Sequence, residues 1–144
     1  MKHPMFKILR IFALAAMVVL AAACTPGTVK KGGKSAAVED RAVQRWEDLI
    51  AKRAADAYEY LTPGYRKTHP KDVYALAMAN RPVKWKTVNY MRKECEDDNT
   101  CTVFIYLVYE LRISAGIPGP VEGVSIEKEK WLRIKGVWYH LPDK

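Results

Sequence analysis

The sequence predicts an α+β domain in which N-terminal helices pack against one face of a four-stranded antiparallel sheet. Apolar residues recur at helical spacing between residues 38 and 79. After residue 82 the chain is rich in β-branched and aromatic residues, interrupted by Gly and Pro turns. The chain has 144 residues, which is enough for one domain.

Three helices are expected in the first half. The first begins at Val38, and its buried face is predicted to hold Ala42, Val43, Trp46, Leu49 and Ile50. The second follows almost without a break and is expected to stop at Thr62-Pro63-Gly64. The third should run from Pro70 to about Ala79, with Val73, Leu76 and Ala77 as its buried stripe.

Four strands are expected in the second half. The first should cover residues 83–94, and the strongest one residues 101–113. All odd positions of the second strand are apolar or aromatic, and its first half is apolar on both faces, which is typical of a central strand. Residues 114–120 form a Gly/Pro loop. One face of the third strand should hold Val124, Ile126, Leu132 and Ile134, and the last strand should cover residues 137–141.

The first 23 residues have the pattern of an export signal. Lys2, Lys7 and Arg10 precede an uncharged run of 13 residues at 11–23. A membrane-spanning helix needs about 20 apolar residues, so the run fits a secretory signal better than a permanent N-terminal anchor. Small residues at 21–23 suit cleavage by a signal peptidase. We therefore expect residues 1–23 to be a cleaved signal peptide.

Cys24 follows that signal directly. The segment Leu20-Ala21-Ala22-Ala23-Cys24 resembles the lipobox of bacterial lipoproteins. The resemblance implies that the Cys24 thiol is acylated and becomes the first residue of the mature chain. Thr25 in the next position, where an Asp would retain the protein at the inner membrane, suggests the outer membrane facing the periplasm. Ordinary secretion with a free thiol at Cys24 is the alternative.

Residues 24–37 are expected to be the lipidated cysteine and a flexible tether, and residues 38–144 the domain. The tether is rich in Gly, Lys and small residues without apolar periodicity. The net charge of the chain is +8, and +5 without the signal, since the signal carries three of the cations. That modest excess is expected to be spread along the sequence. A basic balance suits anionic lipid headgroups, and the export signal argues against nucleic acid as a partner.

The chain has three cysteines. Cys95 and Cys101 lie close together at an expected hairpin turn, and a structural disulfide between them would suit an oxidising compartment. A zinc site is disfavoured because no second Cys/His pair is present. The acidic residues of the turn lack the ligand spacing of a calcium loop. The sequence thus predicts no metal and no cofactor.

Several segments together resemble bacterial proteins of the nuclear transport factor two-like superfamily. They are Trp46, Leu49-Ile50, Ala57-Tyr58, 61–66, 83–85, 101–103, 130–131 and 137–139. The resemblance implies a cone formed by a curved sheet around helices, with the site at its open mouth. It also implies that a homodimer through the sheet is plausible. That superfamily contains enzymes and non-enzymes, so the fold does not settle the function.

Seven side chains are candidates for lining the cone: Tyr58, Tyr65, Trp85, Tyr106, Glu110, Trp138 and His140. Aromatic residues at these spacings are mostly core. His140 is expected to be an exposed strand histidine, and Glu110 to pair across the sheet with Lys128 or Lys130. No catalytic motif is present among them.

Three functions stay open. The first is a non-enzymatic, lipid-anchored module that binds a small apolar ligand or an envelope protein. The second is a periplasmic enzyme that uses the cone for proton transfer on a small apolar substrate, with Asp56 as a further candidate. The third is a structural subunit of an envelope complex.

Overall fold

The computed structural model describes residues 36–111 and 119–143 of the chain. The predicted signal peptide, Cys24 and most of the Gly/Pro loop lie outside them. The elements are α1 (Val38–Ile50), α2 (Ala54–Ala57), the 3₁₀ turn η1 (Tyr58–Tyr60), α3 (Pro63–Thr68), α4 (Lys71–Ala79), β1 (Val83–Asp97), β2 (Thr100–Leu111), β3 (Val121–Ile134) and β4 (Val137–Leu141).

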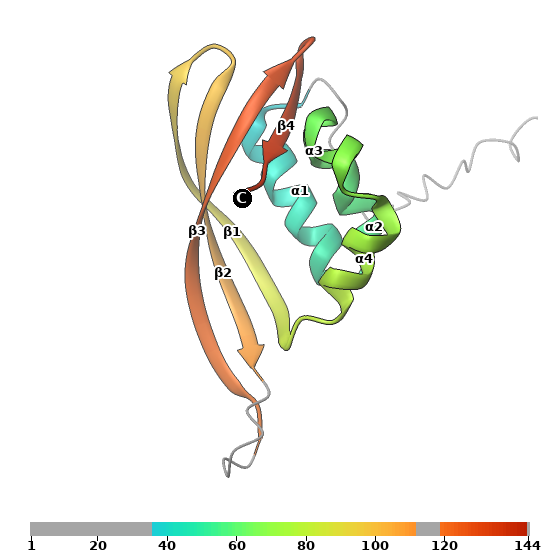
Figure 1. Cartoon of the computed structure of the whole chain (residues 1–144). Helices are drawn as coiled ribbons and strands as arrows, with labels where there is room; N and C mark the ends of the chain where they lie inside the picture. Colours follow the sequence, from blue (N-terminus) through green and yellow to red (C-terminus); the bar gives the residue numbers. More distant parts are fainter. Residues whose placement is uncertain (1–35, 112–118, 144) are drawn as a thin grey trace, which may run out of the picture.

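The four strands form one antiparallel sheet in the order β1-β2-β3-β4. The sheet is twisted and curved, and the helices gather on one side of it (Figure 1). This arrangement confirms the predicted fold class. No helix of the described part is long and apolar enough to cross a membrane.

The core lies between α1 and the helix-facing side of the sheet. Alternate residues of β2 are buried there, as their odd-position periodicity predicts: Cys101, Val103, Ile105 and Leu107. Val38, Ala42, Trp46 and Leu49 of α1 pack onto the same cluster, together with Trp131 of β3. Because these four apolar positions of α1 are three or four residues apart, they form a single stripe along the helix.

Val124 and Ile126 of β3 share a face, as their spacing predicts. That face points away from the helices, and the two side chains are 57% and 53% exposed. The helix-facing side of the strand instead presents Glu129 and Trp131, which contact α1. The outer face of the sheet therefore carries exposed apolar residues.

The helical half differs from prediction at two connections. α1 and α2 are not continuous, because the chain turns at residues 51–53 and Lys52 adopts a left-handed φ of 60°. Thr62-Pro63-Gly64 ends one helical segment but also begins α3. The Thr62 hydroxyl accepts a hydrogen bond from the Tyr65 N–H at 3.4 Å, and Pro63 occupies the first turn, where its missing N–H costs little.

The predicted buried stripe of α4 is wrong. Val73 and Leu76 are 56% and 63% exposed, and Ala77 is exposed as well. The buried residue is Tyr74, which packs beside Tyr58, with Met78 half-buried one turn later. Periodicity alone does not choose between two faces of a short helix that are both apolar.

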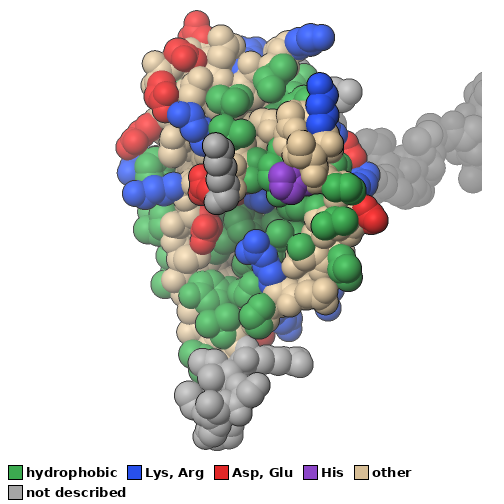
Figure 2. Space-filling model, viewed as in Figure 1, with side chains coloured by type: hydrophobic (Ala, Val, Ile, Leu, Met, Phe, Trp, Pro, Cys, Tyr) green, Lys and Arg blue, Asp and Glu red, His purple; other side chains and the backbone are tan. Residues whose placement is uncertain are grey.

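The predicted disulfide joins Cys95 and Cys101, with an S–S distance of 2.04 Å. The two residues are direct partners in the β1–β2 register, so the bond closes the tip of that hairpin. Asp97 supports the turn by accepting a hydrogen bond from the Asn99 N–H at 2.7 Å. Acidic side chains gather at the same end of the molecule (Figure 2).

Candidate functional site

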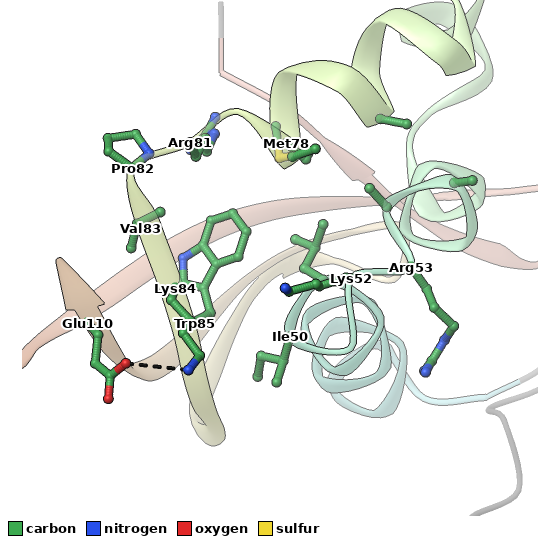
Figure 3. Close-up of a pocket in the computed structure, with 15 residues that line it drawn as sticks. Ile50, Lys52, Arg53, Met78, Arg81, Pro82, Val83, Lys84, Trp85 and Glu110 are labelled. Carbon is green, nitrogen blue, oxygen red and sulfur yellow. Dashed lines mark ion pairs between the residues drawn. The ribbon is translucent and has the colours of Figure 1, made fainter. Parts of the chain in front are cut away.

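A cleft of about 750 Å³ lies where the C-terminal end of α1 and the start of α2 face α4 and the start of β1 (Figure 3). This volume falls within the range of about 300–1,000 Å³ that is usual for sites of small ligands. Ten apolar residues line it: Leu49, Ile50, Ala54, Ala55, Ala75, Met78, Ala79, Pro82, Val83 and Trp85. The other five lining residues are charged: Lys52, Arg53, Arg81, Lys84 and Glu110.

Trp85 is the largest apolar side chain in the cleft lining. Its indole stands between the β1 strand and the end of α1, next to Ile50 and Lys52 in the view of Figure 3. Trp46 holds it from the core side through an edge-to-face contact, with ring centroids 5.4 Å apart and an angle of 75° between the rings. The ring therefore links the cleft to the packed interior.

Among the described residues that line the cleft, Glu110 is the single carboxylate, and lysines neutralise its charge. Glu110 lies 3.0 Å from the Lys86 ammonium and 3.6 Å from that of Lys84. The hydrogen bond from Lys86 lowers the pKa of Glu110, assisted by the charge of Lys84. Glu110 thus pairs with β1, not with Lys128 or Lys130 as expected, because the register places it opposite Lys84. A carboxylate with a lowered pKa is a weak general base at neutral pH.

The four cations that line the cleft differ in whether they pair with a carboxylate. Arg53 donates two hydrogen bonds to Asp48, at 3.0 and 2.6 Å, and its guanidinium points away from the cleft (Figure 3). Lys84 shares Glu110 with Lys86. Within the described residues, Lys52 and Arg81 have no carboxylate partner. Lys52 extends from its left-handed backbone position toward Trp85, and Arg81 lies 6.0 Å from the centre of the Trp85 ring.

This positive charge is local. The described residues contain sixteen Lys and Arg and sixteen Asp and Glu, so their net charge is zero. The excess positive charge of the chain is therefore not spread through the domain, contrary to the expectation from the sequence. It belongs to eight residues outside the described part: Lys2, Lys7, Arg10, Lys30, Lys31, Lys34, Arg112 and Lys144.

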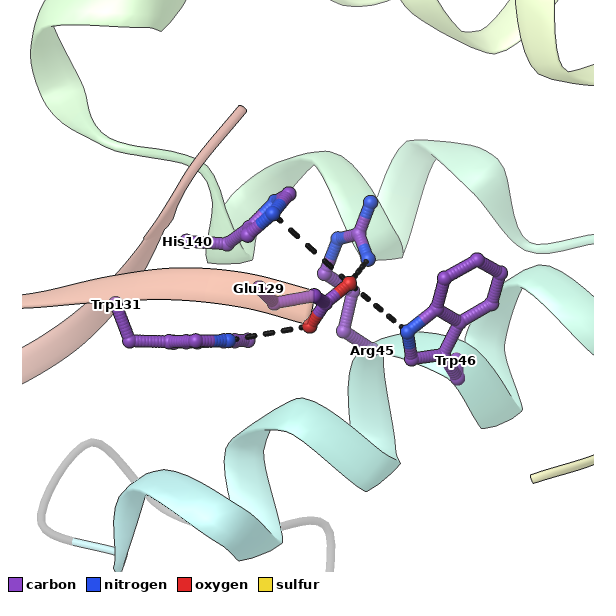
Figure 4. Close-up of polar contacts among 5 residues, drawn as sticks. All are labelled: Arg45, Trp46, Glu129, Trp131 and His140. Atoms are coloured by element: carbon purple, nitrogen blue, oxygen red, sulfur yellow. Dashed lines mark hydrogen bonds and ion pairs between the residues drawn. The ribbon is translucent and has the colours of Figure 1, made fainter. Parts of the chain in front are cut away.

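A second polar group is buried beside α1, outside the cleft lining (Figure 4). The Glu129 carboxylate of β3 is 4% exposed. Its Oε1 accepts hydrogen bonds from Arg45 Nη1 at 2.6 Å and Trp46 Nε1 at 2.9 Å. Its Oε2 accepts one from Trp131 Nε1 at 3.1 Å. These bonds tie the first helix to the third strand through one carboxylate.

His140 of β4 approaches the same carboxylate, with Nε2 3.9 Å from Oε1 of Glu129. Burial, together with the nearby Arg45 charge, lowers the pKa of His140 to about 2. His140 is consequently neutral at physiological pH, and its approach to Glu129 is not an ion pair. Burial also raises the pKa of Glu129, against the opposing influence of Arg45 and the two indole N–H groups.

The expectation that His140 is exposed is therefore wrong. The Leu61 segment pairs with β4 at this residue, and the Thr62 N–H donates to the His140 carbonyl at 2.9 Å. The final strand is thus covered by the helical half of the chain. Neither ring nitrogen has a hydrogen-bond partner in the described part at a distance shorter than 3.5 Å.

Of the seven predicted site residues, the fold brings only Trp85 and Glu110 to the cleft. The Tyr58 hydroxyl lies 2.7 Å from the His69 carbonyl oxygen, inside the helical layer. The Tyr65 ring stacks on His69 with centroids 3.9 Å apart. Tyr106 lies opposite Ile126 on the face of the sheet that points away from the helices.

Trp138 packs against the core, and its carbonyl accepts a hydrogen bond from Arg41 at 2.7 Å. Sequence reasoning missed the cleft residues Lys52, Met78 and Arg81. They lie at the ends of helices, where periodicity carries little information. Within the described residues, no group of three or more Cys, His, Asp or Glu could hold a metal ion.

Neither the models of known protein families nor the sequences of curated proteins match this chain. Among solved structures, it is similar to a SEC-C motif containing protein from Rhodopseudomonas palustris. The TM-score is 0.56 at 18% identity, over 76% of this chain and 78% of that one. A second similar structure comes from Campylobacter jejuni.

The Campylobacter jejuni protein is provisionally described as an NTF2-like transpeptidase. Its TM-score is 0.49 at 14% identity, over 73% of this chain and 97% of that one. At these identities a likeness concerns the fold and not the activity. The class defined here is accordingly an α+β domain with helices on one face of a four-stranded antiparallel sheet, distantly similar in structure to these two proteins.

Proposed function

We propose that this chain is a lipid-anchored protein of the bacterial outer envelope whose domain binds a small apolar molecule in the cleft. The observation that carries the binding proposal is the cleft itself. It has a ligand-sized volume, a mostly apolar lining and one aromatic ring held by the core. Glu110, the one carboxylate among the described lining residues, is held by lysines that lower its pKa, which favours binding over proton-transfer chemistry.

The envelope location is supported by the sequence. The basic n-region, the apolar run at 11–23 and Cys24 follow one another in the order of a lipoprotein signal. The Cys95–Cys101 disulfide suits the oxidising conditions outside the cytoplasm. Multiple acyl chains on one cysteine anchor a protein firmly, where a single chain is marginal.

Replacing Cys24 with serine is expected to abolish the anchor. When the full chain is expressed in a Gram-negative host, the wild-type protein should carry acyl mass on a chain that begins at Cys24, in the outer-membrane fraction. The Cys24→Ser chain should be soluble or uncleaved. Intact-mass spectrometry and membrane fractionation measure both. An unmodified wild-type chain in the soluble periplasm would contradict the anchor.

Filling the cleft is expected to weaken binding of a neutral apolar dye such as N-phenyl-1-naphthylamine. Ala79→Phe adds a ring to a lining residue near the end of α4 and should raise the dissociation constant about tenfold. Ala77→Phe changes an exposed residue of the same helix outside the lining and serves as the control. Dye fluorescence measures both. Equal affinities for the two variants would place the dye elsewhere.

A second candidate is assembly through the outer face of the sheet, for which the exposed Val124 and Ile126 are the specific observation. They lie opposite Val108 and Tyr106, which gives a continuous apolar row. A second copy of the chain could cover this row in a two-fold dimer. Ile126→Lys is then expected to shift sedimentation velocity from dimer to monomer, whereas the similarly exposed Val73→Lys is not. A monomeric wild-type protein at high concentration excludes this dimer.

A further inference from the structure

We infer that the cleft selects an amphiphile with an alkyl chain and an anionic head, a carboxylate or a phosphate, and that Lys52 and Arg81 hold the head group. This inference rests on the proposed function, since it specifies the ligand of the same cleft. Two observations support it: the types of side chain that line the cleft, and which of the lining cations have a carboxylate partner.

Among the described residues, the lining consists of apolar and charged side chains, without neutral polar ones. Of the lining residues in the described part of the chain, ten are apolar and five are charged, and none is Ser, Thr, Asn, Gln, His or Tyr. A sugar or a nucleobase presents several neutral donors and acceptors that would stay unpaired against such walls. An alkyl chain presents none, so its burial here carries no polar penalty.

The polar end of the ligand is defined by the cations that are available. Arg53 is occupied by Asp48, and the Glu110 carboxylate is occupied by Lys84 and Lys86. Lys52 and Arg81 remain without a carboxylate partner in the described part of the chain. They belong to the two connections that bound the cleft, α1–α2 and α4–β1, and both lie toward Trp85 (Figure 3).

The charge contrast strengthens this assignment. The lining carries four cations against one acid, whereas the described residues as a whole are neutral. The cleft is therefore more positive than the protein around it. Local excess charge of one sign favours a ligand of the opposite sign. A cationic amphiphile would face uncompensated repulsion at the same place.

Lys52 also adopts an uncommon backbone conformation. A non-glycine residue with φ near 60° lies in the sparsely populated left-handed region of backbone conformations. That conformation directs the side chain to the edge of the cleft, where it reaches toward the Trp85 ring (Figure 3). A lysine at this turn is thus placed where a head group would enter.

The test compares ligands that share one chain length: dodecanoate, dodecanol, dodecyltrimethylammonium and dodecyl phosphate. Each displaces N-phenyl-1-naphthylamine from the full-length Cys24→Ser chain at pH 8, below its micelle concentration. We expect dodecanoate to bind about tenfold tighter than dodecanol, and the trimethylammonium compound to bind weakest. The Lys52→Gln/Arg81→Gln variant should bring dodecanoate to the dodecanol value without changing dodecanol binding.

The chain offers a matched control for this variant. Lys135 has a left-handed φ of 51°, comparable to Lys52, and Arg133 lies 6.0 Å from the Trp138 ring, as Arg81 does from Trp85. Neither residue lines the cleft. Lys135→Gln/Arg133→Gln should therefore retain the preference for dodecanoate, and circular dichroism should show both variants folded.

The outcomes separate the two proposals. If the dye and dodecanol bind but neither dodecanoate nor dodecyl phosphate binds tighter than dodecanol, the anionic head is overturned and the apolar cleft stands. If neither the dye nor any amphiphile binds, both proposals fall. Dodecanoate binding that survives Lys52→Gln/Arg81→Gln places the head group elsewhere and overturns the assignment. Whichever of dodecanoate and dodecyl phosphate binds tighter identifies the class of the head group.

Discussion

A Glu129→Ala variant is expected to lose about 3–5 kcal/mol of unfolding free energy, the usual consequence of removing one partner of a buried ion pair. The substitution leaves the Arg45 guanidinium buried without its counter-ion, since Arg45 and Glu129 side chains are 8% and 5% exposed. It also removes the acceptor of the Trp46 and Trp131 indole N–H groups. Urea unfolding followed by circular dichroism measures the loss.

Two further variants show whether the buried charge is the cause. Glu129→Gln keeps an acceptor oxygen for the indoles and should lose less than Glu129→Ala. The double variant Arg45→Met/Glu129→Leu removes both charges and should be more stable than Glu129→Ala alone, because no ion is left unpaired. If the double variant were instead less stable by the full sum of the single losses, the two side chains would not act as a pair.

The second large effect is expected in the pH dependence of stability at His140. Its pKa falls from 6.5 in the unfolded chain to about 2 in the folded one. Below pH 6.5 the unfolded state therefore binds one more proton than the native state at this residue. The contribution of His140 to the free energy of unfolding is present above that pH. It is lost as the pH falls, by about 1.4 kcal/mol per pH unit once the unfolded histidine is fully protonated.

The comparison of wild type with His140→Gln isolates this effect. The groups that face His140 are Glu129, Arg45 and the Trp131 ring, and both proteins retain them. Between pH 6.5 and pH 4, the free energy of unfolding of the wild type should fall by about 3 kcal/mol more than that of the variant. Chemical unfolding at a series of pH values measures the difference. If the difference in unfolding free energy between the two proteins did not change with pH, His140 would take up its proton in the folded state and pair with Glu129.

Hydrophobic periodicity predicts the helices and strands of this fold well. It predicts less well which face of an element is buried. The spacing of Ala42, Trp46 and Leu49 locates the buried face of α1, and the alternation along β2 locates the core side of that strand. The same reasoning fails for α4, where Val73 and Leu76 are exposed. A pattern shows which residues share a face, but the neighbouring elements decide which face is covered.

The candidate site shows the same division. Trp85 and Glu110 are among the seven candidates chosen from the sequence, but the other five lie outside the cleft lining. Lys52 and Arg81 could not be chosen from the sequence, since a lysine and an arginine at helix ends are usually solvated. Their significance depends on what else lies nearby: one lining acid, already paired with two lysines, and a tryptophan ring.

By itself, the sequence determined the α+β class, the four antiparallel strands and the cysteine pair, because these depend on local periodicity and on closeness along the chain. Only the tertiary structure decided that Glu129 and His140 are buried and that four cations line an apolar cleft. Burial and charge balance are sums over residues distant in sequence. They exist only after helix and sheet have packed together.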